Sequence, residues 1–213
     1  MRNWHVYLIT SQELSGGRST LEVVKEAVAA GVDVVQLREK TMEGKELLEL
    51  GRKIREITKE AGVKYIVNDR VDIALLTDAD GVHLGQGDIP YNYARSLVGE
   101  KMIIGISVDT VEQAVKAERE GADYIGVGPV YATNSKNNAG PCLGLENLKK
   151  IRSNSTIPIV AVGGINQGNA TEVILNGADC LSVISAITQA EDIQASVREL
   201  KRQIISGKGE LNK

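Results

Sequence analysis

The sequence lacks the features that mark a disulfide-stabilised, membrane-spanning or nucleic-acid-binding protein. Its only two cysteines, Cys142 and Cys180, have neither the spacing of a metal site nor that of a redox pair, so no disulfide is expected. No apolar run approaches the roughly 18 residues that a transmembrane helix needs. The formal net charge is −3, and no basic stripe or polybasic segment would attract nucleic acid or a membrane surface.

Length and composition are those of one globular domain. The 213 residues suffice for a large core, and 42% hydrophobic with 25% charged residues is ordinary for such a domain. Residues 1–5 run into a strand-like segment that is too short and polar for a signal peptide. We therefore expect a cytoplasmic protein with a single domain over residues 1–213, of which about 207–213 form a flexible tail, and the sequence is compatible with a homo-oligomer.

Eight short apolar runs alternate with helical patterns along the chain. Each run is rich in β-branched residues and almost continuously apolar, as expected of a parallel strand that is buried on both faces. The intervening segments carry apolar residues at three- and four-residue spacing, which gives each helix one face to lay against a sheet. The runs are residues 6–9, 32–36, 65–67, 81–84, 102–106, 124–127, 159–162 and 180–184, and the clearest helical segments are 19–30, 42–61, 110–120, 166–175 and 190–205.

A three-residue signature recurs where helices give way to strands. It is Gly31-Val32-Asp33, Gly121-Ala122-Asp123 and Gly177-Ala178-Asp179. Glycine just after a helix permits the left-handed cap, and the strand begins at the next residues. Eight such units in a chain of this length leave no room for a second domain. The repetition favours a closed (β/α)₈ TIM barrel over an open doubly wound sheet, which stays as the alternative.

Two acids, Asp69 and Asp88, follow the third and fourth runs, with room for only a short helix between them. If these runs are parallel strands, both carboxylates emerge on one rim. Two hard oxygen ligands suit Mg²⁺, which is held by few protein oxygens and keeps positions for water and phosphate. A structural role as helix N-caps fits the spacing equally well.

Basic residues follow the runs as well, at the end of the barrel where functional residues are expected. Arg38 and Lys40 alternate along an extended segment, so both can face the barrel mouth while Glu39 turns away. Cations and carboxylates together suit phosphate oxygens and a bridging metal. Lys136 lies in a polar loop, where a lone lysine is more often simply solvated.

Small residues follow the last two runs. Gly163 and Gly164 come after the seventh, and Ile184 and Ser185 close the eighth, where many barrels bind phosphate through backbone N–H groups. A tight turn with positive φ would also explain the glycines, and both roles can hold together. His83, inside the fourth run, is interpreted as a hydrogen-bonded core histidine and not as a catalytic base.

Six segments spread over about residues 7–187 form a combined pattern. They are Tyr7-Leu8-Ile9-Thr10, Gln36-Leu37-Arg38-Glu39-Lys40, Asn68-Asp69-Arg70, Gly81-Val82-His83-Leu84-Gly85-Gln86, Gly126-Val127-Gly128-Pro129-Val130-Tyr131 and Gly163-Gly164-Ile165. Each is weak alone, but together they resemble the thiamine phosphate synthase family. The resemblance implies a (β/α)₈ barrel and a transferase that couples hydroxymethylpyrimidine diphosphate with hydroxyethylthiazole phosphate, giving thiamine phosphate and pyrophosphate.

The same resemblance implies roles for individual residues. Diphosphate contacts would be Arg38, Lys40, Asn68, Ser107 and Lys136, and the Mg²⁺ ligands Asp69 and Asp88. Gln36 would lie beside the pyrimidine, Thr133 and Ser135 near the thiazole substrate, and Gly164, Ile184 and Ser185 around its phosphate. In the implied mechanism the C–O bond to diphosphate breaks first, and the thiazole nitrogen attacks the resulting pyrimidine carbocation. No protein nucleophile is needed, and no Ser-His or Cys-His pairing is evident in the sequence.

Some positions depart from the family's usual pattern. The segment Ala132-Thr133-Asn134-Ser135-Lys136 replaces Pro-Thr-x-Thr-Lys, Asn138 stands where an acid is common, and Val108-Asp109 replaces a histidine-containing segment. These changes bear on loop order and substrate positioning more than on the reaction.

Two alternatives belong to other functional classes. A related thiazole tautomerase would not need the metal-binding acids, so their retention disfavours it. A non-catalytic protein that binds thiazole phosphate or thiamine phosphate would not need the full set of diphosphate contacts. Other phosphate-binding barrels, acting on sugar phosphates or in tryptophan synthesis, rank third.

Overall fold

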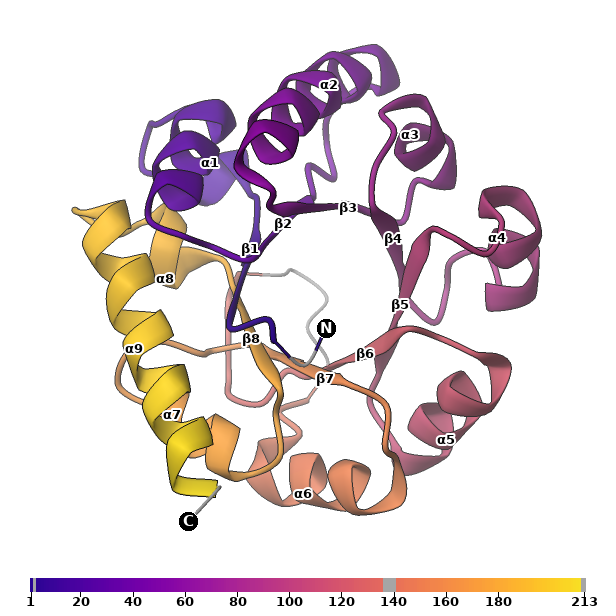
Figure 1. Cartoon of the computed structure of the whole chain (residues 1–213), viewed down its shortest axis with the longest axis vertical. Coiled ribbons are helices and arrows are strands. Elements are labelled where there is room, and N and C mark those ends of the chain that lie inside the picture. The colour runs from indigo at the N-terminus through magenta and orange to yellow at the C-terminus, as the bar shows by residue number, and fades with distance from the viewer. Residues whose placement is uncertain (2, 136–140, 212–213) are drawn as a thin grey trace.

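The computed structural model describes residues 1, 3–135 and 141–211. In this part of the chain eight parallel strands close into a barrel in chain order, and β1 pairs with β8 (Figure 1). The predicted (β/α)₈ barrel is therefore confirmed, and the open sheet is wrong. The strands are β1 (Val6–Ile9), β2 (Val34–Leu37), β3 (Lys64–Asn68), β4 (Gly81–Leu84), β5 (Ile103–Val108), β6 (Tyr124–Val127), β7 (Ile159–Val162) and β8 (Cys180–Val183).

The helices form a ring outside the barrel (Figure 1). They are η1 (Gln12–Leu14), α1 (Thr20–Ala29), α2 (Gly44–Ala61), α3 (Val71–Leu76), α4 (Tyr91–Val98), α5 (Val111–Glu120), α6 (Gly144–Asn154), α7 (Ala170–Leu175), α8 (Ser185–Thr188) and α9 (Ile193–Leu211).

Two helix boundaries differ from the sequence-based prediction by four residues or more. Helix α7 begins at Ala170 and not at residue 166, because the Asn166 and Asn169 side chains hydrogen-bond backbone groups in the preceding turn. Helix α9 continues to Leu211, where a flexible tail from about residue 207 was expected. The physical reason is packing, since Gly207 is buried against Ile174 of α7.

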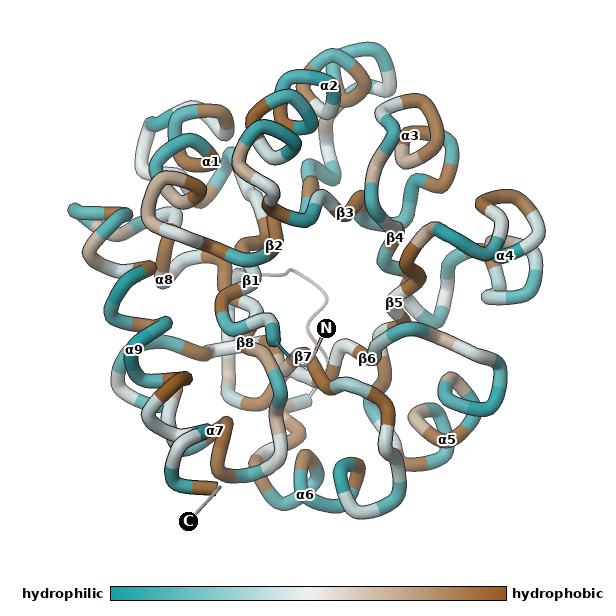
Figure 2. Tube along the Cα trace, in the orientation of Figure 1, coloured by the Kyte–Doolittle hydropathy of each residue, from teal (hydrophilic) through white to brown (hydrophobic). Residues whose placement is uncertain are grey.

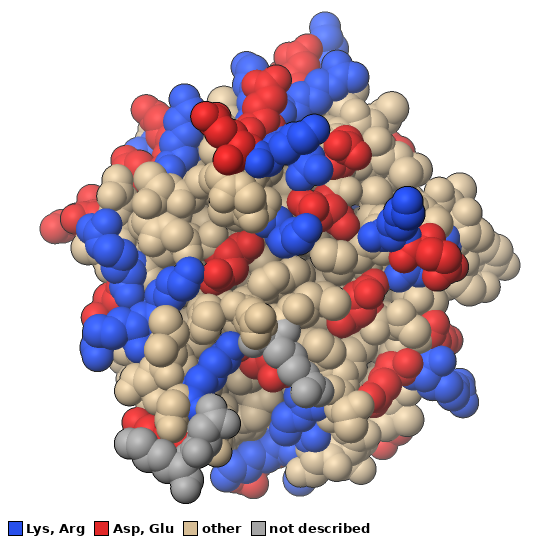
Figure 3. All heavy atoms as spheres, in the orientation of Figure 1, with Lys and Arg blue, Asp and Glu red and all other residues tan. Residues whose placement is uncertain are grey.

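Four aspartates at the N-terminal ends of the even-numbered strands anchor the strands that precede them. Each carboxylate accepts a backbone N–H from the start of the previous strand and pairs with a cation. The sets are Asp33 with Val6 and Lys201, Asp80 with Tyr65 and Arg55, Asp123 with Ile104 and Arg95, and Asp179 with Ile159 and Arg152, with N–H···O distances of 2.8–3.0 Å. Charges of both signs are interspersed over the face shown in Figure 3.

The recurring turn signature therefore has a structural cause. It also occurs a fourth time, with an aspartate in place of the glycine. Gly31, Gly121 and Gly177 all have positive φ, and Asp78 takes the same left-handed conformation with φ of 52° two residues before Asp80. Burial alone would raise the pKa of Asp80, but the Tyr65 N–H and the neighbouring lysine and arginine lower it. The charged carboxylates thus fix the N-terminal ends of the strands.

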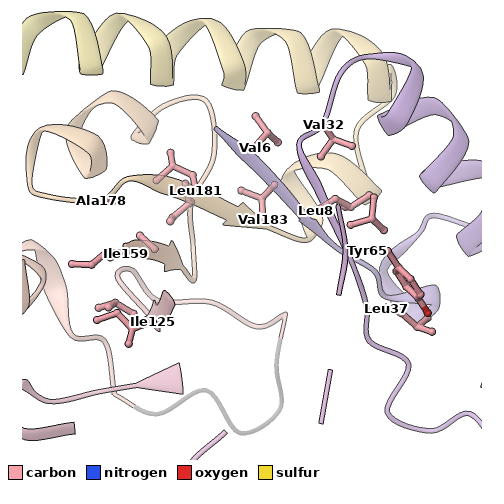
Figure 4. Close-up of a cluster of buried hydrophobic side chains, with 14 of the residues drawn as sticks. Val6, Leu8, Val32, Leu37, Tyr65, Ile125, Ile159, Ala178, Leu181 and Val183 are labelled. Atoms are coloured by element: carbon pink, nitrogen blue, oxygen red, sulfur yellow. The ribbon is translucent and has the colours of Figure 1, made fainter. Parts of the chain in front are cut away.

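Hydrophobic side chains fill two layers, one between the barrel and the helices and one inside the barrel. Figure 2 shows hydrophobic residues along the strands, and Figure 4 shows Val6 and Leu181 on the side of β1 and β8 that faces α9. The interior layer consists of Tyr7, Ile9, Val34, Ile66, Tyr124, Val160, Cys180 and Ile184, with Trp4 packed against it.

Glycine makes room for the largest side chain of this interior. A Cβ added to Gly105 on β5 would lie 2.1 Å from the Cζ of Tyr124, which is fully buried on β6. Trp4 contacts the same ring edge-on, with ring centroids 5.8 Å apart. The Tyr124 ring therefore fits in this place only because Gly105 on the neighbouring strand has no side chain.

Gly105→Ala should lower the free energy of unfolding by about 2 to 3 kcal/mol, because the new methyl group overpacks a rigid core. Gly209→Ala is the control, since its Cβ meets nothing within 4 Å in helix α9. That change should raise the free energy of unfolding by up to about 1 kcal/mol. Urea unfolding of both variants measures the difference, and equal small effects would contradict the packing described for Tyr124.

Candidate functional site

A cavity of about 850 Å³ opens at the C-terminal ends of strands β5 to β8. Among its walls are six residues that the sequence predicted for substrate binding: Ser107, Thr133, Ser135, Gly164, Ile184 and Ser185. The cavity is also lined by Asp109, Pro129, Asn166, Ser182 and Gln189, which the prediction had not included. Ser107 lies on β5, whereas the other five predicted residues follow β6, β7 or β8. Closure of the barrel therefore brings all six together.

The glycine pair allows the loops after β6 and β7 to approach closely. Gly163 and Gly164 have φ of 97° and 65°, which confirms the predicted positive-φ turn. Tyr131 N donates to Gly163 O at 3.1 Å, and a Cβ at Gly164 would lie 2.6 Å from the Tyr131 Cβ. Glycine is thus required both by the turn and by the neighbouring chain.

The loops after β6 and β8 also meet. The Ser135 hydroxyl donates to the Ser185 hydroxyl at 3.3 Å, and Ser185 is the first residue of α8. Within its own loop, Thr133 Oγ1 accepts from Ser135 N at 3.2 Å. Three residues with hydroxyl groups therefore line the cavity close together, an arrangement that can bind phosphate oxygens.

The two acids do not act as helix caps. The N-cap of α3 is Arg70 and that of α4 is Pro90, and neither helix has a side-chain cap hydrogen bond. The Asp69 carboxylate instead pairs with Lys40, and Asp88 Oδ2 accepts from Gly85 N at 2.7 Å. The N-cap interpretation is therefore wrong for both residues.

Backbone geometry sets Asp69 apart as well. Its φ is 60°, in the left-handed region that non-glycine residues rarely adopt. Its N–H donates to His83 O at 2.8 Å, which ties the end of β3 to β4. Such backbone conformations concentrate at functional sites.

The acid pair fits a magnesium ion. Burial and the nearby Asp69 carboxyl group raise the pKa of Asp88, as expected when two carboxylates approach each other. The described residues contain no group of three or more His, Cys, Asp or Glu that could enclose a metal. Two carboxylates suit Mg²⁺, which retains water and binds phosphate through its other positions.

The cations lie next to this acid pair. Lys40 pairs with Asp69. Burial lowers the pKa of Arg38, whereas the Asp69 carboxylate acts to raise it. Glu39 is turned away as predicted, because its carboxylate accepts from Gln12 N and from Thr20 Oγ1. Arg38 and Lys40 therefore both lie near Asp69 at the rim, and Lys40 is paired with it.

The predicted site falls into two adjoining parts. Arg38, Lys40, Asn68, Asp69 and Asp88 are not in the walls of the cavity but belong to the neighbouring strands β2 to β4 and the loops after them. Ser107 on β5 lies in the cavity wall, and its strand pairs with β4. Lys136 lies outside the described residues.

The polar groups inside the barrel were only partly anticipated. Gln36 is 3% exposed, and its Nε2 donates to the Tyr7 hydroxyl at 2.7 Å. His83 has hydrogen-bond partners at both ring nitrogens, as the interpretation as a core histidine requires. Ser182, also 3% exposed, lines the cavity, and its hydroxyl has no hydrogen-bond partner among the described residues.

Within the described residues, no helix has the length and apolar character needed to cross a membrane.

Comparisons with known proteins converge on one family. The family model for thiamine monophosphate synthase matches residues 6–187. The chain is 50% identical to the thiamine-phosphate synthase of Moorella thermoacetica, over 98% of this chain and 100% of that protein. It is 51% identical to that of Pelotomaculum thermopropionicum, over 95% and 93%. The solved thiamine phosphate pyrophosphorylase from Pyrococcus furiosus is 40% identical with a TM-score of 0.88, covering 97% of this chain and 98% of that one.

Ser182→Ala should leave the free energy of unfolding within about 0.5 kcal/mol of the original or raise it, because the deleted hydroxyl makes no hydrogen bond within residues 1, 3–135 and 141–211. Ser155→Ala is the matched control, since the Ser155 hydroxyl is also buried but donates to Glu118 at 2.8 Å. That variant should lower the free energy of unfolding by about 1 to 2 kcal/mol. Equal losses in urea unfolding would show that the Ser182 hydroxyl has a partner in the ligand-free protein.

Proposed function

Because the chain belongs to the thiamine monophosphate synthase family, we propose that it couples hydroxymethylpyrimidine diphosphate with hydroxyethylthiazole phosphate to give thiamine phosphate and pyrophosphate. As a member of this family the chain is a transferase. The observation that carries the proposal is the pair of facing carboxylates, Asp69 and Asp88, flanked by cations beside a cavity large enough for a second substrate.

The diphosphate is assigned to the rim formed by β2 to β5. Arg38, Lys40, Asn68 and Ser107 would contact its oxygens, with Lys136 as a further predicted contact. Asp69 and Asp88 would hold Mg²⁺, which supplies charge neutralisation to the departing diphosphate when bound. Lys40 now neutralises Asp69, so it would be released toward the diphosphate once another cation takes its place.

The chemistry requires no protein nucleophile. The C–O bond between the pyrimidine methylene and the diphosphate breaks, and its electron pair stays on the diphosphate oxygen. The pyrimidine ring stabilises the carbocation, and the thiazole nitrogen lone pair then forms the C–N bond. Arg38, Lys40 and Ser107 stabilise the negative charge that develops on the leaving group.

The thiazole phosphate is assigned to the cavity, because three hydroxyls and the glycine turn converge there. Gly164, Ile184 and Ser185 would surround its phosphate, and Thr133 and Ser135 would lie near the thiazole. Gln36 is assigned to the pyrimidine. Two adjoining binding parts of this kind match a reaction that joins two phosphorylated substrates.

A coupling assay with both substrates tests the proposal. Product should require Mg²⁺ and both substrates, and a chelator should abolish it. Isomerisation of a thiazole phosphate without metal would favour the tautomerase, and binding of thiazole phosphate or thiamine phosphate without turnover would favour a binding protein.

Asp69→Asn and Asp88→Asn should each reduce turnover by at least about a hundredfold, the scale of losing one major electrostatic stabiliser. Asparagine tolerates the positive φ of residue 69, so the fold should persist. Asp72→Asn is the control, because this exposed carboxylate only pairs with Arg70 on the surface. Turnover per folded molecule should be measured together with thermal unfolding, and near-normal turnover in either rim variant would contradict the metal assignment.

Ser185→Ala should raise the KM for the thiazole phosphate by about tenfold, the loss of one hydrogen bond to a charged group, and barely change that for the pyrimidine diphosphate. Substitutions of Gly164 are less informative, because any side chain there meets the Tyr131 backbone. Ser96→Ala on α4, whose hydroxyl only donates to Tyr93 O, is the control. Equal effects of Ser185→Ala on both KM values would refute the two-part assignment.

A further inference from the structure

A continuous chain of side-chain hydrogen bonds crosses the barrel interior. Gln36 Nε2 donates to the Tyr7 hydroxyl at 2.7 Å, and the Tyr7 and Tyr124 hydroxyls are 2.9 Å apart. The Tyr124 hydroxyl is 2.9 Å from His83 Nδ1, and His83 Nε2 is 2.9 Å from Ser107 Oγ. Five strands contribute, and the two ends are both residues assigned to the pyrimidine diphosphate.

The chain has one direction that satisfies every hydroxyl. Because Gln36 donates to Tyr7, the Tyr7 hydroxyl is left to donate to Tyr124, and Tyr124 to the unprotonated Nδ1 of His83. Protonated Nε2 then donates to Ser107 Oγ, and the hydroxyl hydrogen of Ser107 is left for another acceptor.

The opposite direction leaves a buried donor unused. If His83 Nδ1 donated to Tyr124, and Tyr124 to Tyr7, the Tyr7 hydroxyl would accept twice, and its hydrogen would have no acceptor among the described residues. Tyr7 is 1% exposed and Tyr124 0%, so bulk water cannot serve as the missing acceptor. An unsatisfied buried donor is costly. Burial also raises the pKa of both phenols, so each keeps its hydrogen at neutral pH.

The sequence provides space for this arrangement. A Cβ at Gly126 would lie 2.9 Å from the His83 ring, as one at Gly105 would clash with Tyr124. The His83 and Tyr124 rings stack with centroids 5.4 Å apart. Two glycines on adjacent strands therefore admit two rings, and the rings restrict each other's rotation.

We propose that His83 and Tyr124 are positioning residues that hold Ser107 as a hydrogen-bond donor to the diphosphate of the pyrimidine substrate. The identity of that anion rests on the proposed function. With Nε2–H directed at Ser107 Oγ, the serine hydrogen is directed to an anionic oxygen. In the other tautomer the serine would donate to His83 and turn a lone pair toward the anion, which repels it.

The tautomer can be read directly. The chain has only two histidines, His5 and His83, so the ¹⁵N spectrum of histidine-labelled protein, assigned with a His5→Gln variant, separates their ring nitrogens. The proposal expects His83 protonated at Nε2 and unprotonated at Nδ1 near neutral pH. Protonation at Nδ1, alone or together with Nε2, would overturn it, whether or not the coupling reaction occurs.

Kinetics test the positioning role. His83→Leu, which keeps bulk but no donor, should reduce kcat by about 10- to 100-fold, as for a donor aimed at developing charge, with a smaller change in the KM for the pyrimidine diphosphate. His83→Gln should recover most of kcat, because its amide N–H can reach Ser107. Tyr91→Phe is the control, since the Tyr91 hydroxyl binds Gly121 O outside the barrel.

A double-mutant cycle with Ser107→Ala decides whether His83 acts through the serine. In the Ser107→Ala background, His83→Leu should change kcat by less than about twofold, because coupled residues are non-additive. Fully additive losses, or a His83→Gln variant as impaired as His83→Leu, would overturn the proposal. If the wild-type chain does not couple the two substrates, calorimetric binding of pyrophosphate by the same four variants replaces kcat, so failure of the function and of the inference are distinguished.

Discussion

Hydrogen bonds from the first backbone N–H groups of the odd-numbered strands to aspartates at the base of the even-numbered strands hold the barrel in register. Asp33, Asp80, Asp123 and Asp179 each join two strands and at least one cation. Because side chains alternate along a strand, this register decides which residues face the interior and which face the helices. A shift by one residue would turn Tyr124 and Ser107 out of the barrel.

The site depends on that register in two ways. It places Gln36 and Ser107 near the end of the barrel that carries the acid pair, and the polar side chains between them cross the interior. It also brings Asp69 and Asp88 close enough for burial and mutual repulsion to raise the pKa of Asp88. An acid pair of this kind is destabilising without a cation, and Lys40 supplies one at Asp69. These features support the metal–diphosphate complex that we propose for the rim.

The strands and barrel could be predicted from sequence, because continuous apolar runs and Gly-x-Asp turns are local signals. The fourth turn escaped notice, since Asp78 replaces glycine at the left-handed position. The end of α9 was placed too early because its stability comes from packing of Gly207 against α7, which no local pattern reports.

The sequence predicted which residues belong to the site better than it predicted how they are arranged. Capping and metal binding by Asp69 could not be separated from spacing alone, whereas the backbone of α3 excludes capping. Ser182 and the Tyr7–Tyr124–His83 contacts were missed, because strands that are buried on both faces show no alternation to reveal which residues point inward. Only the register of the closed barrel makes those contacts visible.

We propose above all that Asp69 and Asp88 bind a divalent cation together with a diphosphate. A crystal structure with pyrophosphate and Mn²⁺ in place of Mg²⁺ tests it most directly, because anomalous scattering locates the metal. We expect a metal peak bound by both carboxylates and by pyrophosphate oxygens, with Lys40 moved from Asp69. Pyrophosphate bound with no metal at this pair, and Lys40 still on Asp69, would contradict it.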